Sequence, residues 1–117
     1  LLKKLKKIYS LHIITNGFKQ VQHHKISNSG LTPYFSQIII AGEVGYKKPN
    51  PKIFEIAMHN ANTNPRNSLM IGDSVEADIE GALNLGMQAL HFNSHNEAEH
   101  KKCPIVYSLD EIYKLFN

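Results

Sequence analysis

The sequence predicts an α/β protein with three layers, in which helices cover both faces of a parallel β-sheet. Short apolar runs suited to buried strands alternate along the chain with segments of helical periodicity. Several of these runs end in small polar residues that lead directly into a helix, as strands of parallel sheets do. With 117 residues, 42% hydrophobic and 20% charged, the chain can form one hydrophobic core, so a single domain is expected over residues 1–117.

Each predicted element has boundary or periodicity signals of its own. Gly30 and Gly86 end two helices, and Asn50 followed by Pro51 begins another. The first helix carries an apolar stripe beside a lysine-rich face, which favours a helix that covers the sheet over a membrane-binding helix. Strands are expected at residues 11–15, 37–41, 69–71, 88–92 and 105–108. Helices are expected at residues 1–8, 18–28, 51–61, 75–85 and 109–116.

The most informative stretch follows the apolar run at residues 69–71, where Asp73 precedes a helix that contains Asp78. A carboxylate at the carboxyl end of a strand lies where open α/β folds bind ligands, which makes Asp73 a candidate metal ligand. A plainer alternative is that Asp73 is the helix N-cap, with Glu76 as its capping-box partner and Asp78 as a solvated acid.

Two further segments carry groups that suit an anion. Thr15 supplies a hydroxyl, and the Asn16-Gly17 turn after the first strand exposes backbone N–H groups. Lys48 lies in the loop before the helix at 51–61, at the same end of the predicted sheet, where its ammonium can neutralise a phosphoryl oxygen. The plainer alternatives are an ordinary strand-to-helix turn and a solvated pair of lysines.

Thr15, Lys48 and Asp73 with Asp78, in this order, resemble the second, third and fourth motifs of the haloacid dehalogenase-like (HAD) hydrolase superfamily. The similarity extends over nearly the whole chain and implies a Rossmann-like αβα core. The first motif of that superfamily, a DxD sequence whose leading Asp is the nucleophile, occurs nowhere in this sequence. The chain therefore resembles the C-terminal portion of such a hydrolase, with motifs two to four. The first central strand, the first motif and the cap domain are expected to be missing.

The resemblance implies a Mg²⁺-dependent phosphatase that hydrolyses a small phosphorylated metabolite through an aspartyl-phosphate intermediate. Thr15 and Lys48 would be catalytic, and Asp73 would bind the Mg²⁺. Asp78 would hold the ligand arrangement in place without contacting the metal itself. The residues implied to bind phosphate are Thr15, Asn16, Gly17 and Lys48. Because the nucleophile is absent, the chain is expected to be inactive by itself. A haloacid dehalogenase-type hydrolase and a non-catalytic interaction module are the alternatives.

The composition argues against several partners. A net charge of only +3, with Arg66 as the one arginine, argues against a nucleic-acid surface. No apolar run approaches the roughly 20 residues that span a bilayer, so no membrane contact is expected. The single cysteine, Cys103, cannot form an internal disulfide, which fits the cytoplasm. The seven histidines are expected to be scattered over the surface.

The missing strand has a consequence for assembly. In the superfamily it lies between the strands that end near Thr15 and Asp73, so the apolar runs at 11–14 and 69–71 would lose their shared neighbour. Unpaired strand edges promote association. The chain is therefore expected to rearrange those strands, or to fill the gap from a second copy as a homodimer or swapped dimer.

Overall fold

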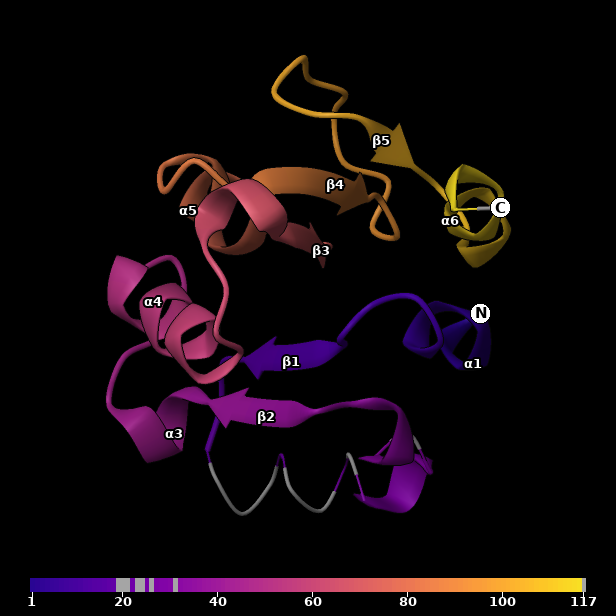
Figure 1. Cartoon of the computed structure of the whole chain (residues 1–117). Coiled ribbons are helices and arrows are strands. Elements are labelled where there is room, and N and C mark those ends of the chain that lie inside the picture. Colours follow the sequence, from indigo (N-terminus) through magenta and orange to yellow (C-terminus); the bar gives the residue numbers. More distant parts are fainter. Residues whose placement is uncertain (19–21, 23–24, 26, 31, 117) are drawn as a thin grey trace. The chain divides into compact units, whose positions relative to one another are not determined.

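The computed structural model of the chain describes residues 1–18, 22, 25, 27–30 and 32–116 (Figure 1). The chain divides into two compact units, Leu1–Asn62 and Thr63–Asn117, which are described here in turn. Every strand pair in the described part of the chain is parallel, and helical segments lie between successive strands except the last two, which a loop joins. The predicted α/β class with parallel strands is therefore confirmed.

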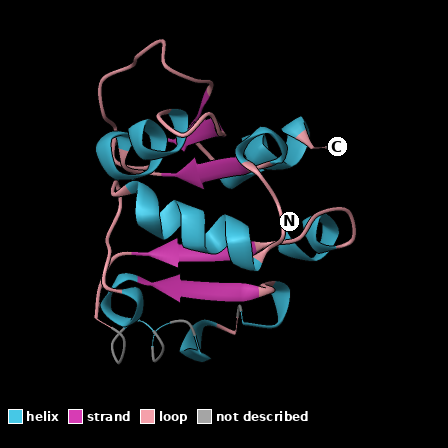
Figure 2. Ribbon diagram, turned by 60° about the vertical axis from the view of Figure 1, so that its left-hand side comes forward, coloured by secondary structure: helices cyan, strands magenta, loops and turns pink. Residues whose placement is uncertain are grey.

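The first unit contains a two-stranded parallel sheet. Its elements are α1 (Leu2–Lys6), β1 (His12–Thr15), the 3₁₀ turn η1 (Thr32–Tyr34), β2 (Gln37–Ile40), α3 (Ala41–Val44) and α4 (Pro51–Asn60). β1 pairs with β2 in a register that sets Thr15 beside Ile40. Figure 2 shows the long helix of this unit, α4, running along the two strands. This arrangement brings the carboxyl ends of β1 and β2 to the same edge.

Helix α4 forms where the sequence predicts it. The Asn50 side chain accepts a hydrogen bond from the Lys52 N–H at 2.9 Å, and Pro51 occupies the first helical position. One face of the helix is buried together with the end of β2, which forms the core of the unit. The buried core residues of this unit are Leu5, Ile39, Ile40, Ile53, Phe54, Ala57 and Met58.

Two predicted elements of the first unit end earlier in the structure, and a third lies partly outside the described residues. β2 ends at Ile40, because the next residue begins the short helix α3, which the sequence did not signal. α1 ends at Lys6, so Ile8 lies beyond the helix and is 63% exposed. The helix predicted at 18–28 falls partly outside the described residues; of that range, residues 22, 25, 27 and 28 are helical.

The second unit contains a three-stranded parallel sheet in the order β3-β4-β5. Its elements are the 3₁₀ turn η2 (Pro65–Asn67), β3 (Leu69–Gly72), the π-helical segment η3 (Val75–Glu80), α5 (Gly81–Leu83), β4 (Gln88–Phe92), β5 (Ile105–Val106) and α6 (Leu109–Leu115). Leu90, Val106 and Ile112 form a buried cluster that joins β4, β5 and α6, and Phe92 and Phe116 pack against it. This cluster anchors the C-terminal helix to the sheet.

The helix predicted at 75–85 is not a regular α-helix. It begins as η3, in which the Ile79 N–H donates to the Ser74 carbonyl oxygen five residues earlier at 3.2 Å. The Asp78 N–H donates to the same oxygen at 2.9 Å. Only the short α5 follows, and Gly86 ends the segment with a φ of 82°, as predicted. The first turn is therefore wider than an α-helical turn.

The strand pairing fits a parallel sheet that lacks one strand. Within the described chain β1 pairs only with β2, and β3 only with β4, so each is an edge of its sheet. On β3, Leu69 is 40% exposed and Ile71 is 37% exposed. The predicted incomplete sheet is confirmed. The expected rearrangement of these strands and the expected dimerisation through their edges both stay predictions. None of the described helices is long and apolar enough to cross a membrane.

Candidate active site

The predicted site residues lie in both units, at the carboxyl ends of β1 and β3, in the loop before α4 and in η3. Thr15, at the end of β1, is half-buried and its hydroxyl is held by a neighbour that sequence reasoning missed. Gln22 donates from Nε2 to Thr15 Oγ1 at 3.0 Å and to the Asn16 carbonyl oxygen at 2.7 Å. The only sequence signal for Gln22 was its position on the helix expected after the turn. The Gln22 side chain fixes both the Thr15 hydroxyl and the turn that follows Thr15.

Asn16 joins the turn after β1 to the lysine loop. Its Oδ1 accepts a hydrogen bond from the Lys48 N–H at 2.8 Å, and its Nδ2 donates to the Lys48 carbonyl oxygen at 3.1 Å. The Gly17 carbonyl oxygen accepts from the Gly42 N–H at 2.9 Å, which ties the same turn to α3. The φ of 144° at Gly17 is one that L-residues rarely adopt.

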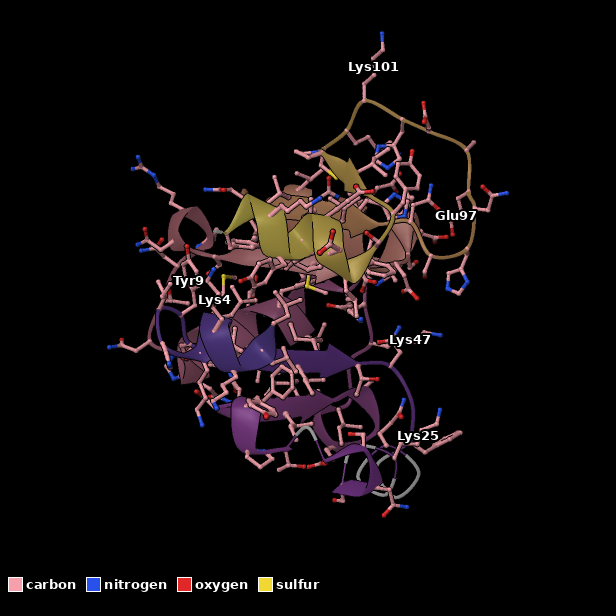
Figure 3. All side chains as sticks on the ribbon, turned by 90° about the vertical axis from the view of Figure 1, so that its right-hand side faces the viewer. Lys4, Tyr9, Lys25, Lys47, Glu97 and Lys101 are labelled. Carbon is pink, nitrogen blue, oxygen red and sulfur yellow. The ribbon has the colours of Figure 1, made fainter. Side chains whose placement is uncertain are left out.

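Lys48 is therefore fixed through its main chain. It is half-buried, whereas Lys47 beside it is exposed and projects outward, as Figure 3 shows. This difference argues against a plain solvated lysine pair. The structure brings together the four residues predicted to bind phosphate, namely Thr15, Asn16, Gly17 and Lys48.

Asp73 follows β3 and does not cap the next helix. The cap is Ser74, whose Oγ accepts a hydrogen bond from the Ala77 N–H at 3.0 Å. The alternative in which Asp73 and Glu76 form a capping box is therefore wrong. The Asp73 side chain is 53% exposed, so its carboxylate can reach a ligand beyond the strand.

Asp78 is buried, with 3% of the residue exposed, so it is not a solvated acid. Its Oδ2 accepts a hydrogen bond from the Ser74 N–H at 3.1 Å, which fixes the backbone directly after Asp73. A Cβ at Gly72 would collide with the Cβ, Cγ and Oδ2 of Asp78. The glycine is needed because the buried carboxylate occupies the space of a side chain.

A second residue that sequence reasoning missed is His95. Its Nε2 lies 2.9 Å from Asp73 Oδ2. His95 is carried by the loop after β4, and β4 is the strand paired with β3. Because the two strands are parallel neighbours, their following loops emerge at one edge of the sheet. That adjacency was the signal that could have identified His95.

The histidines are not all on the surface. His91 is fully buried on β4, and its Nδ1 lies 3.0 Å from His100 Nε2 with the two rings stacked. Burial lowers the pKa of the half-buried His12, because an imidazolium loses hydration there. Two of the seven, His23 and His24, lie outside the described residues.

Cys103 carries the one thiol of the chain. Its side chain is partly buried, and burial raises the pKa of its thiol. A raised pKa lowers the fraction of reactive thiolate at neutral pH.

The donor groups at the carboxyl end of β3 suit a hard cation. Asp73 offers carboxylate oxygens, the ligands that Mg²⁺ prefers, and the collision at Gly72 shows that Asp78 is built into the same turn. The described residues contain no group of three or more His, Cys, Asp or Glu side chains arranged to hold a metal ion. Asp73 stays a candidate metal ligand, and its side chain is 53% exposed at the end of β3.

Comparisons with known proteins agree with these features. A family model described as haloacid dehalogenase-like hydrolase matches residues 1–92. The chain belongs to this HAD-like hydrolase family. Among its relatives is the pyrimidine 5'-nucleotidase YjjG of Escherichia coli, 36% identical over 88% of this chain and 46% of that protein. The glyceraldehyde 3-phosphate phosphatase of Methanothermobacter thermautotrophicus is 39% identical over 78% of this chain and 41% of that protein.

A solved HAD hydrolase shares the fold of this chain. It is YfnB from Bacillus subtilis, whose crystal structure is bound to magnesium and superimposes with a TM-score of 0.90 at 28% identity. The superposition covers 99% of this HAD-like chain and 53% of YfnB. The chain spans about half the length of each of these three proteins.

Proposed function

We propose that this chain forms the C-terminal part of a Mg²⁺-dependent phosphatase that hydrolyses the phosphate ester of a small metabolite. The observation that carries the proposal is the Asp73 carboxylate, half-exposed at the carboxyl end of β3 and not used as a helix cap. Relatives named as phosphatases support the reaction type, and the magnesium-bound YfnB structure supports the metal.

The phosphate would be bound by the first unit. The Thr15 hydroxyl and the N–H groups of Asn16 and Gly17 are donors suited to phosphoryl oxygens. The Lys48 ammonium would offset the negative charge that accumulates when a carboxylate and a phosphoryl group meet. The paired hydrogen bonds between Asn16 and the Lys48 main chain support this role, since a fixed backbone limits where the ammonium can reach.

The metal would be bound by the second unit. Asp73 would be the ligand from this chain, and Asp78 would stabilise the turn by accepting the Ser74 N–H. When bound, Mg²⁺ supplies positive charge that screens the repulsion between carboxylate and phosphate and stabilises the transferring group. Asp73 would supply the carboxylate oxygen that binds the cation.

The nucleophile would come from residues outside this chain, because the sequence contains no DxD motif. An aspartate carboxylate would attack the phosphorus, the ester P–O bond would break, and the alcohol would leave with a proton supplied by a general acid. Water would then attack the aspartyl phosphate, losing a proton to the general base, and inorganic phosphate would be released.

The test is phosphate release from a panel of small phosphate esters by the full-length protein that carries this chain. Lys48→Ala should lower kcat by about 10²–10³-fold, as for loss of a group that stabilises transition-state charge. Lys47→Ala is the matched control and should retain wild-type kcat. The 117-residue chain alone should release no phosphate. Wild-type activity in Lys48→Ala, or turnover by the chain alone that a substitution at Asp73 abolishes, would contradict the proposal.

A further inference from the structure

The contact between His95 and Asp73 joins two loops of the second unit. Nε2 of His95 lies 2.9 Å from Oδ2 of Asp73, within the range of a charge-assisted hydrogen bond. Both side chains are largely exposed, at 63% and 53% respectively, so general packing does not force them together. The position of the loop that carries His95 therefore decides whether the contact forms.

That loop is closed by a pair of hydrogen bonds. Asn93 is buried, with 5% exposed; its Nδ2 donates to the Glu97 carbonyl oxygen at 3.0 Å and its Oδ1 accepts from the Glu97 N–H at 2.8 Å. The residues between them form a tight tip, in which the Ser94 N–H donates to the Phe92 carbonyl oxygen at 2.9 Å. His95 is at the centre of this tip, so the pair fixes its main chain.

Further contacts fix the rest of the loop. The buried His91 meets His100 through their ring nitrogens at 3.0 Å, and Lys102 forms an ion pair with Glu80 at the end of η3. Figure 3 shows Glu97 on this loop and Lys101 projecting away from the rest of the unit at its tip. The segment that follows His95 is thus tied to β4 through His100 and to η3 through Lys102.

We propose that His95 is a positioning residue of the metal site: its Nε2–H donates to Asp73 Oδ2 and fixes the carboxylate for the cation. This inference rests on the proposed function. A carboxylate has about four lone-pair sites, so the imidazole and a cation can share one carboxylate. A carboxylate that is already oriented loses less side-chain freedom when the metal binds.

The test measures Mn²⁺ binding to the full-length protein by electron paramagnetic resonance of free Mn²⁺. His95→Ala should weaken Mn²⁺ binding by about 10–100-fold, the usual effect of removing a residue that supports a metal ligand. His95→Gln keeps an N–H donor of similar reach and should restore most of the affinity. In His95→Ala, kcat at saturating Mn²⁺ should return towards the wild-type value, which a folding defect would not allow.

His59→Ala is the matched control, because His59 is an exposed histidine on α4. The His59→Ala protein should bind Mn²⁺ with wild-type affinity. Wild-type affinity in His95→Ala would overturn the positioning role, and tighter binding would show that His95 competes with the metal. Asp73→Asn separates the two proposals. If Asp73→Asn loses Mn²⁺ and His95→Ala does not, only the role of His95 fails. If the wild type binds no Mn²⁺, the proposed function fails and the role of His95 with it.

Discussion

The side-chain amide of Asn16 makes both of its hydrogen bonds to the main chain of one residue, Lys48, at 2.8 and 3.1 Å. An amide paired in this way acts like a neighbouring strand, because it satisfies one N–H and one carbonyl group of the loop. Asn93 binds the main chain of Glu97 in the same manner in the second unit. Each unit therefore uses one asparagine to fix a loop that carries a candidate site residue.

Asn16→Ala should destabilise the protein by about 1–3 kcal/mol, because two hydrogen bonds are lost and the Lys48 backbone groups are left without these partners. Asn16→Asp should cost at least as much, since one carboxylate oxygen would face the Lys48 carbonyl oxygen. Urea denaturation measures both effects. Asn60→Ala, at an exposed position of α4, is the control. Equal stability of Asn16→Ala and Asn60→Ala would show that the pairing contributes nothing.

Gly72→Ala should destabilise the protein by about 1–3 kcal/mol, the usual cost of adding atoms to a well-packed position. The new Cβ would displace the Asp78 carboxylate and break its hydrogen bond to the Ser74 N–H. Gly42→Ala is a fitting control, because Gly42 is exposed in α3 and alanine favours helices. Thermal unfolding measures the stability of both variants against the wild type. A Gly72→Ala protein as stable as the wild type would mean that the turn repacks around the new Cβ without cost.

His12 should make stability depend on pH. Burial holds the pKa of His12 below its ordinary value of 6.5, so the unfolded chain takes up a proton more readily than the folded one. Stability should therefore fall as pH drops below about 6.5, and stop falling below the folded pKa. Its Nδ1 is buried without a hydrogen-bond partner in the described part of the chain.

His12→Gln removes this titration, and the difference between its unfolding free energy and that of the wild type should change between pH 7 and pH 5. Parallel pH profiles for His12→Gln and the wild type would refute the role of His12.

The isolated chain should associate through the edges of β1 and β3, because each has an unpaired ladder in the described sheets. Light scattering of the purified chain should give the mass of a dimer. Ile71→Lys places a charge on the β3 edge and should shift the equilibrium to monomers, whereas Ile8→Lys, outside the strands, should not. A monomeric mass of the unmodified chain in dilute solution would rule out this association.

Local chemistry made some elements predictable from the sequence. The Asn50-Pro51 start of α4 depends on the capping side chain and on the fixed φ of proline, both of which are properties of adjacent residues. The strands were predictable because buried strands of parallel sheets are continuously apolar. Asp73 was found because it directly follows such a strand.

The rest depends on contacts that sequence spacing does not reveal. Gln22 and His95 are polar residues on a helix and a loop, and only the fold brings them to Thr15 and Asp73. The choice of Ser74 over Asp73 as the cap depends on the backbone angles of the turn. His91 is buried because β4 is the central strand of its sheet, and a strand position alone does not show that both faces are covered.

The most direct test of the central claim is the dependence of phosphate release on Mg²⁺ in the full-length protein and in Asp73→Asn. The wild type should require Mg²⁺ and lose activity with a chelator, and Asp73→Asn should lose at least about 100-fold in kcat/KM. Glu76→Gln, at an exposed acid in the first turn of η3, should retain activity. Wild-type kcat/KM in Asp73→Asn, or activity that survives the chelator, would contradict the claim that this chain carries the metal ligand of a phosphatase.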